Sequence, residues 1–155
     1  MVKIGEYEFP DELYYSIEHT WAKVEPDGSV RVGITDFAQK MAGTIVFVRT
    51  LPVGKAVAQL KPFGTLETGK YVGKLYAPVS GAIATTNAKL REQASIINKD
   101  PYVEGWIIVI KPSNLDGDLK NLMKSNSPEF SELMNKKIAE VEAKAKAKLA
   151  EIEKK

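Results

Sequence analysis

Glycine and proline are distributed unevenly along this chain of 155 residues, and their distribution constrains the fold more than any other feature. All 11 glycines and all 8 prolines lie at or before Pro128. Both residues interrupt regular elements and are frequent in turns, so residues 1–128 should form short elements joined by many turns. The last 27 residues contain 6 Glu and 7 Lys but no glycine or proline. We therefore expect a turn-rich domain at 1–128 followed by a charged amphipathic helix at 129–155.

Short β-branched and aromatic runs predict strands in the first part of the chain. Val30–Ile34 alternates apolar with other residues, and the turn at Pro26–Gly28 joins it to a hairpin partner at Trp21–Glu25. Further strands are predicted at Ile45–Val48, Lys55–Lys61, Tyr71–Tyr76, Gly81–Thr86 and Trp106–Lys111. Short helices are predicted at Asp36–Met41 and Leu115–Lys124. Strands of this length and spacing are typical of a mainly β sandwich or barrel.

The final helix has a recognisable start and one apolar stripe. Ser127 can cap it, and Pro128 suits its first position. Residues at steps of three and four form the stripe, which weakens to alanine after Ala143: Phe130, Met134, Ile138, Val141, Ala145, Leu149 and Ile152. This pattern favours a solvated helix that rests partly on the body. A helix for a partner or for self-association, and a frayed end, are the alternatives.

Composition excludes most kinds of chemistry for this chain. Without cysteine there can be no disulfide, thiolate metal site or cysteine nucleophile. His19 is the only histidine, so a metal site is not expected, and beside Trp21 it is interpreted as a structural residue. The net charge of +2 does not suggest nucleic-acid binding, and no apolar run approaches the length of a membrane span. We expect a cytoplasmic protein that is not an enzyme.

The most informative segment is Thr65–Gly81, which predicts a strand, a tight turn and a second strand. Gly69 precedes Lys70 at the expected turn, where glycine would permit a positive φ. A lysine there projects its amine into solvent. In an arbitrary hairpin such a lysine would be an ordinary exposed residue, so the turn alone does not assign a function.

The residues around this turn resemble the lipoylation signature of the H protein of the glycine cleavage system. The resemblance rests on Glu67–Lys70 followed by Tyr76–Gly81, and it extends in order from about Tyr14 to Leu122. Other matching blocks are Gly33–Gln39, Ile45–Val48, Leu51–Pro52, Gly54, Ile97–Asn98, Asp100–Tyr102, Gly105–Trp106 and Ile110–Ser113. A biotin carrier is the obvious rival, but its attachment lysine lies between methionines, unlike Thr68–Tyr71.

The resemblance implies both a fold and a role. The fold would be the hammerhead-type β-sandwich, or barrel-sandwich hybrid, of lipoyl and biotinyl carriers. Lys70 would carry covalently attached lipoic acid, and Glu67, Gly69 and Gly81 would help an attaching enzyme to recognise the hairpin. The cofactor then supplies the sulfur chemistry and the protein presents it. The implied partners are the lipoate-attaching enzyme and a dihydrolipoamide dehydrogenase-like enzyme, together with the enzymes that load and unload the arm.

Three positions depart from the family's pattern where its members line a cleft for the loaded arm. By motif, these positions normally hold Glu, His and Asp, whereas this chain has Thr20, Phe37 and Lys74. Lost carboxylates and an added lysine disfavour a cationic methylamine cargo and suit an anionic one. This favours the family's sulfur-oxidation branch, which works with a heterodisulfide-reductase-like complex. The alternatives are an aminomethyl carrier serving the P and T proteins of glycine cleavage, and an unmodified scaffold or regulatory module.

Overall fold

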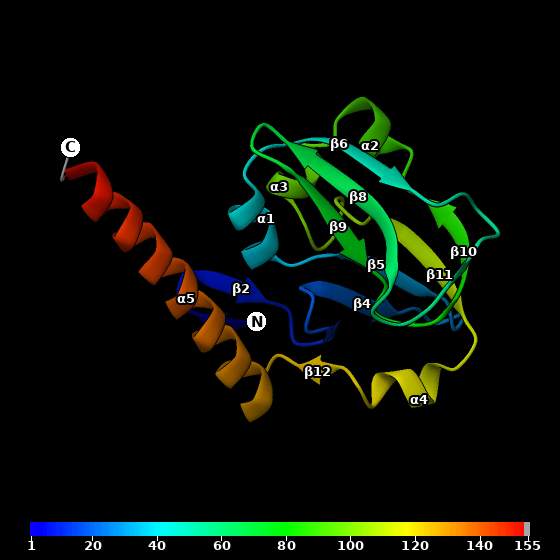
Figure 1. The fold of residues 1–155 in the computed structure, drawn as a ribbon. Helices are drawn as coiled ribbons and strands as arrows, with labels where there is room; N and C mark the ends of the chain where they lie inside the picture. Colours follow the sequence, from blue (N-terminus) through cyan, green and yellow to red (C-terminus); the bar gives the residue numbers. More distant parts are fainter. Residues whose placement is uncertain (154–155) are drawn as a thin grey trace.

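Three sheets make up the body of the protein in a computed structural model that describes residues 1–153 (Figure 1). The strands are β1 (Val2–Ile4), β2 (Tyr7–Phe9), β3 (Tyr14–Tyr15), β4 (Thr20–Val24), β5 (Val30–Ile34), β6 (Ile45–Thr50), β7 (Ala56–Val57), β8 (Pro62–Thr68), β9 (Val72–Tyr76), β10 (Gly81–Thr86), β11 (Ile108–Pro112) and β12 (Met123–Lys124). The helices are α1 (Asp36–Ala42), α2 (Lys89–Glu92), α3 (Ile96–Lys99), α4 (Leu115–Leu119) and α5 (Pro128–Glu153).

The two larger sheets enclose the main core. One has the strand order β12-β3-β4-β5-β11-β10-β7 and the other the order β6-β8-β9, with every pairing antiparallel. Their inner faces bury a continuous cluster that includes Val32, Phe63, Leu75, Ile83 and Ile108. Burial of these large apolar side chains is the main favourable contribution to folding. The predicted β-sandwich with short helices and a C-terminal helix is confirmed.

The predicted hairpin of β4 and β5 is present, with Val24 opposite Val30, but two other predicted elements are shorter than expected. The strand expected at 55–61 is only β7, because the chain then bends through Leu60, whose φ is +63°. The helix expected at 115–124 ends at Leu119, and β12 then pairs with β3. At the end of α4, tertiary pairing overrides a local pattern.

The N-terminal hairpin of β1 and β2 and the short helices α2 and α3 are elements that the sequence patterns did not indicate. Each covers only three or four residues, which is too short for a periodicity to be visible. Gly5 makes the turn of the hairpin at a φ of +61°. The hairpin lies against α1 and α5 and joins them into one unit.

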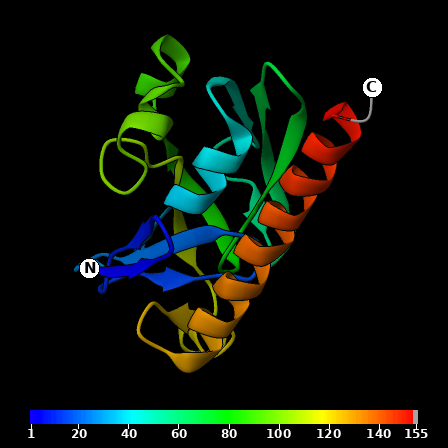
Figure 2. The same cartoon turned by 90° about the vertical axis from the view of Figure 1, so that its left-hand side faces the viewer.

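The helix α5 begins as predicted and is anchored by its first turns. The Ser127 hydroxyl accepts a hydrogen bond from the Phe130 amide at 3.3 Å. Phe130 and Met134 are each 1% exposed, in a second cluster that contains Phe9 and Tyr15. Figure 2 shows α5 running past the β1–β2 hairpin, in agreement with its contact with β1.

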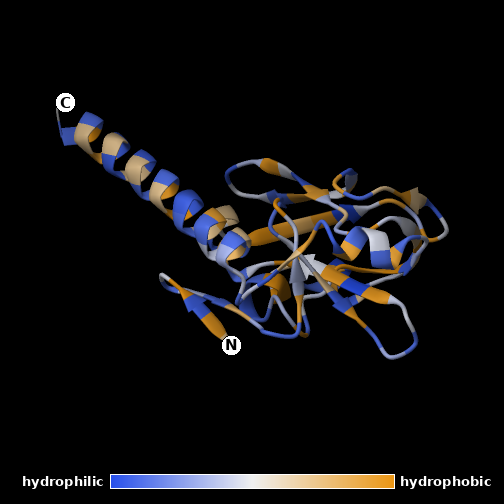
Figure 3. Cartoon of the chain, turned by 90° about the horizontal axis from the view of Figure 1, so that it is seen from below, coloured by the Kyte–Doolittle hydropathy of each residue, from blue (hydrophilic) through white to orange (hydrophobic). Residues whose placement is uncertain are grey.

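The distal half of α5 projects from the body with mixed hydrophilic and hydrophobic residues (Figure 3). Leu149 and Ile152 are 59% and 62% exposed, whereas Ile138 and Val141 pack partly against the second cluster. The expectation of a weaker distal half is therefore confirmed. Of the helices in residues 1–153, none combines the length and apolar character that crossing a membrane requires.

Candidate functional site

The turn between β8 and β9 presents Lys70 to solvent. The Thr68 hydroxyl accepts hydrogen bonds from the amides of Lys70 and Tyr71 at 3.1 and 3.3 Å, and the Thr68 amide donates to the Tyr71 carbonyl oxygen at 3.0 Å. A threonine side chain that satisfies main-chain amides in this way stabilises a tight turn. The positive φ expected at Gly69 is wrong, because Gly69 is absent from the residues that adopt one. Thr68, and not the glycine, organises the turn.

The side chain of Lys70 lies next to the end of α1. Gly43 closes that helix at a φ of +78°, and a Cβ added to Gly43 would lie 3.9 Å from both Cε and Nζ of Lys70. Glycine is favoured here because the left-handed conformation costs other residues free energy. Lys70 is exposed, and the neighbouring residues Ala42 and Tyr71 line a pocket between α1 and the hairpin.

We call this cavity the α1 pocket. It has a volume of about 240 Å³ and lies between α1, the start of β4 and the β8–β9 hairpin. Its lining is mostly apolar: Glu18, His19, Thr20, Ile34, Phe37, Ala38, Met41, Ala42, Leu66, Tyr71, Gly73, Lys74, Leu75 and Tyr76. Thr20, Phe37 and Lys74, the three positions that the sequence singled out for an arm cleft, are thus placed around one cavity.

These three side chains contribute differently to the α1 pocket. Thr20 is 1% exposed, and its hydroxyl lies 2.7 Å from the Ser16 hydroxyl oxygen in a hydrogen bond. Phe37 is buried and packs edge-to-face on Tyr7, with ring centroids 5.0 Å apart. Lys74 is exposed at the rim. These three residues therefore combine an apolar wall and a satisfied hydroxyl with one exposed cation.

Sequence reasoning missed two polar residues of the pocket, Glu18 and His19. His19 has a φ of +66°, which is uncommon for a residue other than glycine. This left-handed residue at the entry to β4 interrupts the alternation of sides, so Glu18, His19 and Thr20 all reach the same pocket. A residue-by-residue comparison of motif positions could not reveal this, because the backbone conformation is not visible in the sequence.

The imidazole of His19 is neutral at physiological pH. Its ring centroid lies 5.1 Å from that of Phe37. Burial lowers the pKa of His19 to about 4, and the ammonium of Lys137 on α5 adds to this effect. The pocket therefore contains an uncharged imidazole, and Glu18 also lines it.

The lowered pKa predicts a loss of stability in acid. Below pH 6.5 the unfolded chain binds a proton at His19, whereas the folded chain binds it only near pH 4. The free energy of unfolding should thus be unaffected above pH 6.5 and should fall by about 2–3 kcal/mol from this residue between pH 6.5 and 4.5. Urea unfolding at pH 7 and 4.5 measures the effect. Asparagine tolerates a positive φ, so His19→Asn should fold in the same way. Between pH 7 and 4.5 its free energy of unfolding should fall by about 2–3 kcal/mol less than that of the unaltered protein. An equal fall in both proteins would contradict the lowered pKa of His19.

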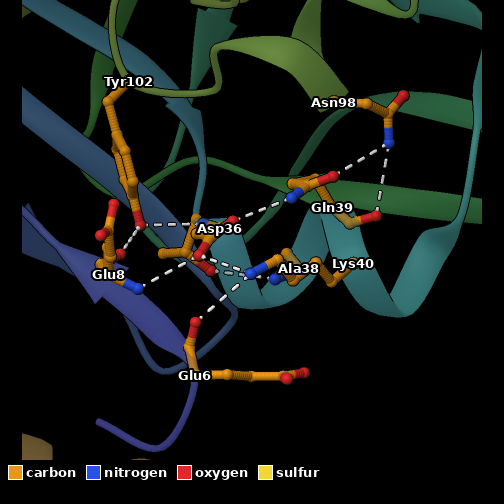
Figure 4. Close-up of polar contacts among 9 residues, drawn as sticks. Glu6, Glu8, Asp36, Ala38, Gln39, Lys40, Asn98 and Tyr102 are labelled. Atoms are coloured by element: carbon orange, nitrogen blue, oxygen red, sulfur yellow. Dashed lines mark hydrogen bonds and ion pairs between the residues drawn. The ribbon is translucent and has the colours of Figure 1, made fainter. Parts of the chain in front are cut away.

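A polar network holds α1, one wall of the pocket, in place (Figure 4). The Asp36 amide donates to the Tyr102 hydroxyl at 2.8 Å, which donates to the Glu8 carbonyl oxygen at 2.6 Å. The Asp36 carboxylate accepts from the Glu8 amide and the Gln39 side chain, and Gln39 accepts from Asn98. Burial raises the pKa of Tyr102, so its hydroxyl keeps the proton that it donates. The network ties α1 to β2 and α3.

Glu67, Gly69 and Gly81, which the sequence suggested for recognition of the hairpin, have different structural environments. Glu67 is half-buried on β8, opposite Val72 of β9 and Phe47 of β6. Gly69 has open space where a Cβ would be added. Gly81 begins β10, away from the turn, and an added Cβ would overlap the Lys111 carbonyl oxygen and lie 2.8 Å from Ile110 Cγ2. The close approach of β10 to β11 therefore requires glycine at this position.

Comparisons with known proteins agree with one another. The family model for the glycine cleavage H-protein matches residues 13–137, which include the first turns of α5. A probable glycine cleavage system H protein of Thermococcus gammatolerans is 46% identical over 79% of this chain and 91% of its own length. Glycine cleavage system H protein 2 of Aquifex aeolicus is 45% identical over 78% of each chain.

A solved structure agrees with this result. The crystal structure of a glycine cleavage system H protein from Mycobacterium marinum superimposes with a TM-score of 0.65 at 35% identity, covering 68% of this chain and 87% of that one. The family match at residues 13–137 spans most of the body, including the hairpin that carries Lys70 and the walls of the α1 pocket. The chain therefore belongs to the glycine cleavage H-protein family, a family of non-catalytic carriers that hold lipoic acid on a lysine.

Proposed function

We propose that this chain is the lipoyl carrier of a glycine cleavage system, with lipoic acid attached through an amide to Lys70. Its partners would be the P, T and L proteins of that system and a lipoate-attaching enzyme. The observation that carries the proposal is the position of Lys70, at an exposed turn beside an apolar pocket in a chain of this family. A tethered group at this turn stays at high effective concentration near the pocket.

The residues around Lys70 suit a lipoyl group. The amine is exposed, so an attaching enzyme can reach it, and Gly43 leaves room beside it. The neighbouring pocket offers Ile34, Met41 and Leu66 to a flexible aliphatic chain. When bound, the lipoyl group supplies the sulfur chemistry that a chain without cysteine lacks. The protein's own residues supply the turn, the apolar wall and the charges at the rim.

The polar lining of the α1 pocket favours the aminomethyl alternative over the sulfur-oxidation pathway that the sequence favoured. That preference assumed that the cleft had lost two carboxylates and an imidazole. Glu18 and His19 both line the pocket and offer one carboxylate and one imidazole from neighbouring positions. A carboxylate attracts a cationic methylamine, and a neutral imidazole can accept a hydrogen bond from it. The names of the relatives also support glycine cleavage.

Lys74 favours the sulfur-oxidation pathway as a second candidate. Lys74 is exposed and lines the pocket together with the apolar ring of Phe37. A cation there repels a cationic cargo and attracts an anionic one. Because Lys74 is exposed, solvent screens this effect, and we rank the candidate below glycine cleavage.

Glycine decarboxylation by a purified P protein separates the two candidates. With fully lipoylated protein, confirmed by mass, we expect turnover to saturate with carrier concentration. Glu18→Gln should lower this turnover, and Lys74→Asp should raise it or leave it unchanged. No turnover from fully lipoylated protein, with a control H protein active in the same assay, would contradict the glycine cleavage proposal and favour an anionic cargo.

We also propose that the lipoate-attaching enzyme recognises Glu67 and Gly69. Gly69→Ala fits the open space at the turn and should leave thermal stability unchanged while slowing lipoylation. Gly81→Ala should instead lower stability by about 1–3 kcal/mol, because the added methyl group overlaps the backbone of β11. Lipoylation rates and melting temperatures of both variants test this distinction. A normal rate for Gly69→Ala would remove that residue from the recognition site.

A further inference from the structure

A second cleft, which shares no lining residue with the α1 pocket, lies along the free edge of β6. This strand pairs with β8 on one side only, and α2 lies along its other side (Figure 1). The Ile45 amide on this strand donates to the Asn98 side chain at 2.9 Å. Within residues 1–153, Phe47–Thr50 make no main-chain hydrogen bond outside the β6–β8 ladder. We call the space beside them, with a volume of about 530 Å³, the β6 cleft.

The β6 cleft carries an uncompensated positive charge. Arg49 on β6 and Arg91 on α2 both line it, and no Asp or Glu does. Neither guanidinium takes part in an ion pair in the described part of the chain, residues 1–153. The guanidinium carbon of Arg49 lies 4.9 Å from the centroid of the Phe47 ring, which holds it at the cleft. Two arginines that line one cleft favour a carboxylate between them.

The remaining lining of the β6 cleft is partly apolar. Val48, Leu90 and Ile107 line it, and all three are buried or half-buried. On the strand itself, Val46 and Phe47 are 59% and 45% exposed. Proteins normally cover or block an exposed edge with apolar residues, because such an edge pairs readily with another chain. A strand edge without main-chain partners at Phe47–Thr50, an apolar lining and two arginines together suit an extended segment with alternating apolar and acidic residues.

We propose that the β6 cleft docks an extended acidic segment of a partner protein, which adds as a strand to the free edge of β6. Its apolar side chains would contact Val48 and Leu90, and its carboxylates would lie between Arg49 and Arg91. Phe47 is opposite Glu67, three residues before Lys70, so a partner bound here is held beside the turn that carries Lys70. If the chain is a lipoyl carrier, as proposed above, that partner is one of the enzymes that act on the lipoyl group; this part of the inference rests on the proposed function.

Peptide binding tests the proposal without any lipoyl group. The probe is a fluorescein-labelled peptide of alternating Glu and Val, and the matched control peptide alternates Lys and Val. The acidic peptide should bind saturably and the basic one should not. Arg49→Glu with Arg91→Glu should weaken binding at least about tenfold. Lys61→Glu with Lys120→Glu changes the net charge equally at exposed positions outside the cleft and should leave binding unchanged.

Hydrogen exchange distinguishes strand addition from diffuse attraction. Amides of Phe47–Thr50 that face the cleft should become protected when the acidic peptide binds. If Arg49→Glu with Arg91→Glu alters the melting temperature, the double variant Arg49→Gln with Arg91→Gln replaces it in the binding measurement. Two results would contradict the proposed docking site. One is the absence of saturable binding at about 1 mM acidic peptide. The other is an equal loss of affinity for the acidic peptide in the double lysine variant and the double arginine variant.

Dimerisation and lipoylation measurements distinguish the docking proposal from its alternatives. Dimerisation of this chain that Arg49→Glu abolishes would make a second copy the occupant and would overturn the choice of an acidic partner. Normal glycine decarboxylation without peptide binding would reject the docking site alone. Peptide binding without lipoylation would leave the docking site intact and reject the carrier function, so the two failures are distinguishable.

Discussion

Lys70→Arg should abolish lipoylation and, with it, all turnover of the carrier in glycine decarboxylation. Arginine keeps the positive charge and the exposed position at the β8–β9 turn, but its guanidinium is a poor nucleophile and cannot form the amide. The turn itself depends on Thr68, so the fold should be unchanged. Intact mass, melting temperature and decarboxylation rate are the three measurements.

Lys74→Arg is the matched control for this variant. Lys74 is also exposed and lies on the same hairpin, so the substitution makes the same chemical change four residues away. It should be lipoylated as completely as the unaltered protein. If lipoylation persists in Lys70→Arg and disappears in Lys74→Arg, the attachment site has been assigned to the wrong lysine.

Removal of α5 should destabilise the body, although the sequence divides the chain at residue 128. Phe130 and Met134 are each 1% exposed and pack in the second cluster with Phe9 and Tyr15. Loss of a buried phenylalanine and a buried methionine costs about 3–5 and 2–5 kcal/mol, respectively. Because a typical domain is stable by about 5–15 kcal/mol, a chain that ends at Ser127 should be largely unfolded or marginally stable. Urea unfolding followed by tryptophan fluorescence checks this.

A shorter truncation provides the control. A chain that ends at Ala143 keeps Phe130, Met134, Ile138 and Val141 and removes the exposed Leu149 and Ile152. Its free energy of unfolding should stay within about 1 kcal/mol of that of the full chain. We therefore propose that the first half of α5 belongs to the body and only the distal half is an appendage. A chain ending at Ser127 with full stability would contradict this and support a boundary at 128.

Patterns that extend over several residues predicted the fold well. Alternation in Val30–Ile34 and the turn before it located the β4–β5 hairpin, and Ser127 with Pro128 located the start of α5. Elements of two to four residues, such as β1 and α3, were missed because they are shorter than any detectable period. The end of α4 was misplaced because pairing of β12 with β3 decides it.

The candidate site was only partly accessible from the sequence. The position of Lys70 at the tip of a hairpin followed from the Gly69–Lys70 pair and the family resemblance, although Thr68 and not Gly69 organises the turn. The composition of the α1 pocket did not, because it depends on the left-handed conformation of His19, which brings Glu18 into the lining. The β6 cleft could not be predicted either, because Arg49 and Arg91 are 42 positions apart in the sequence and line one cleft only in the folded chain.

The modification state of Lys70 tests the central claim most directly. Intact mass spectrometry of the protein purified from its native cells, followed by peptide mapping, measures it. The carrier function predicts a mass increase of one lipoyl group, confined to the peptide that contains Lys70. An unmodified protein from cells that lipoylate their other carriers would contradict it and favour a scaffold or regulatory module that has kept the fold.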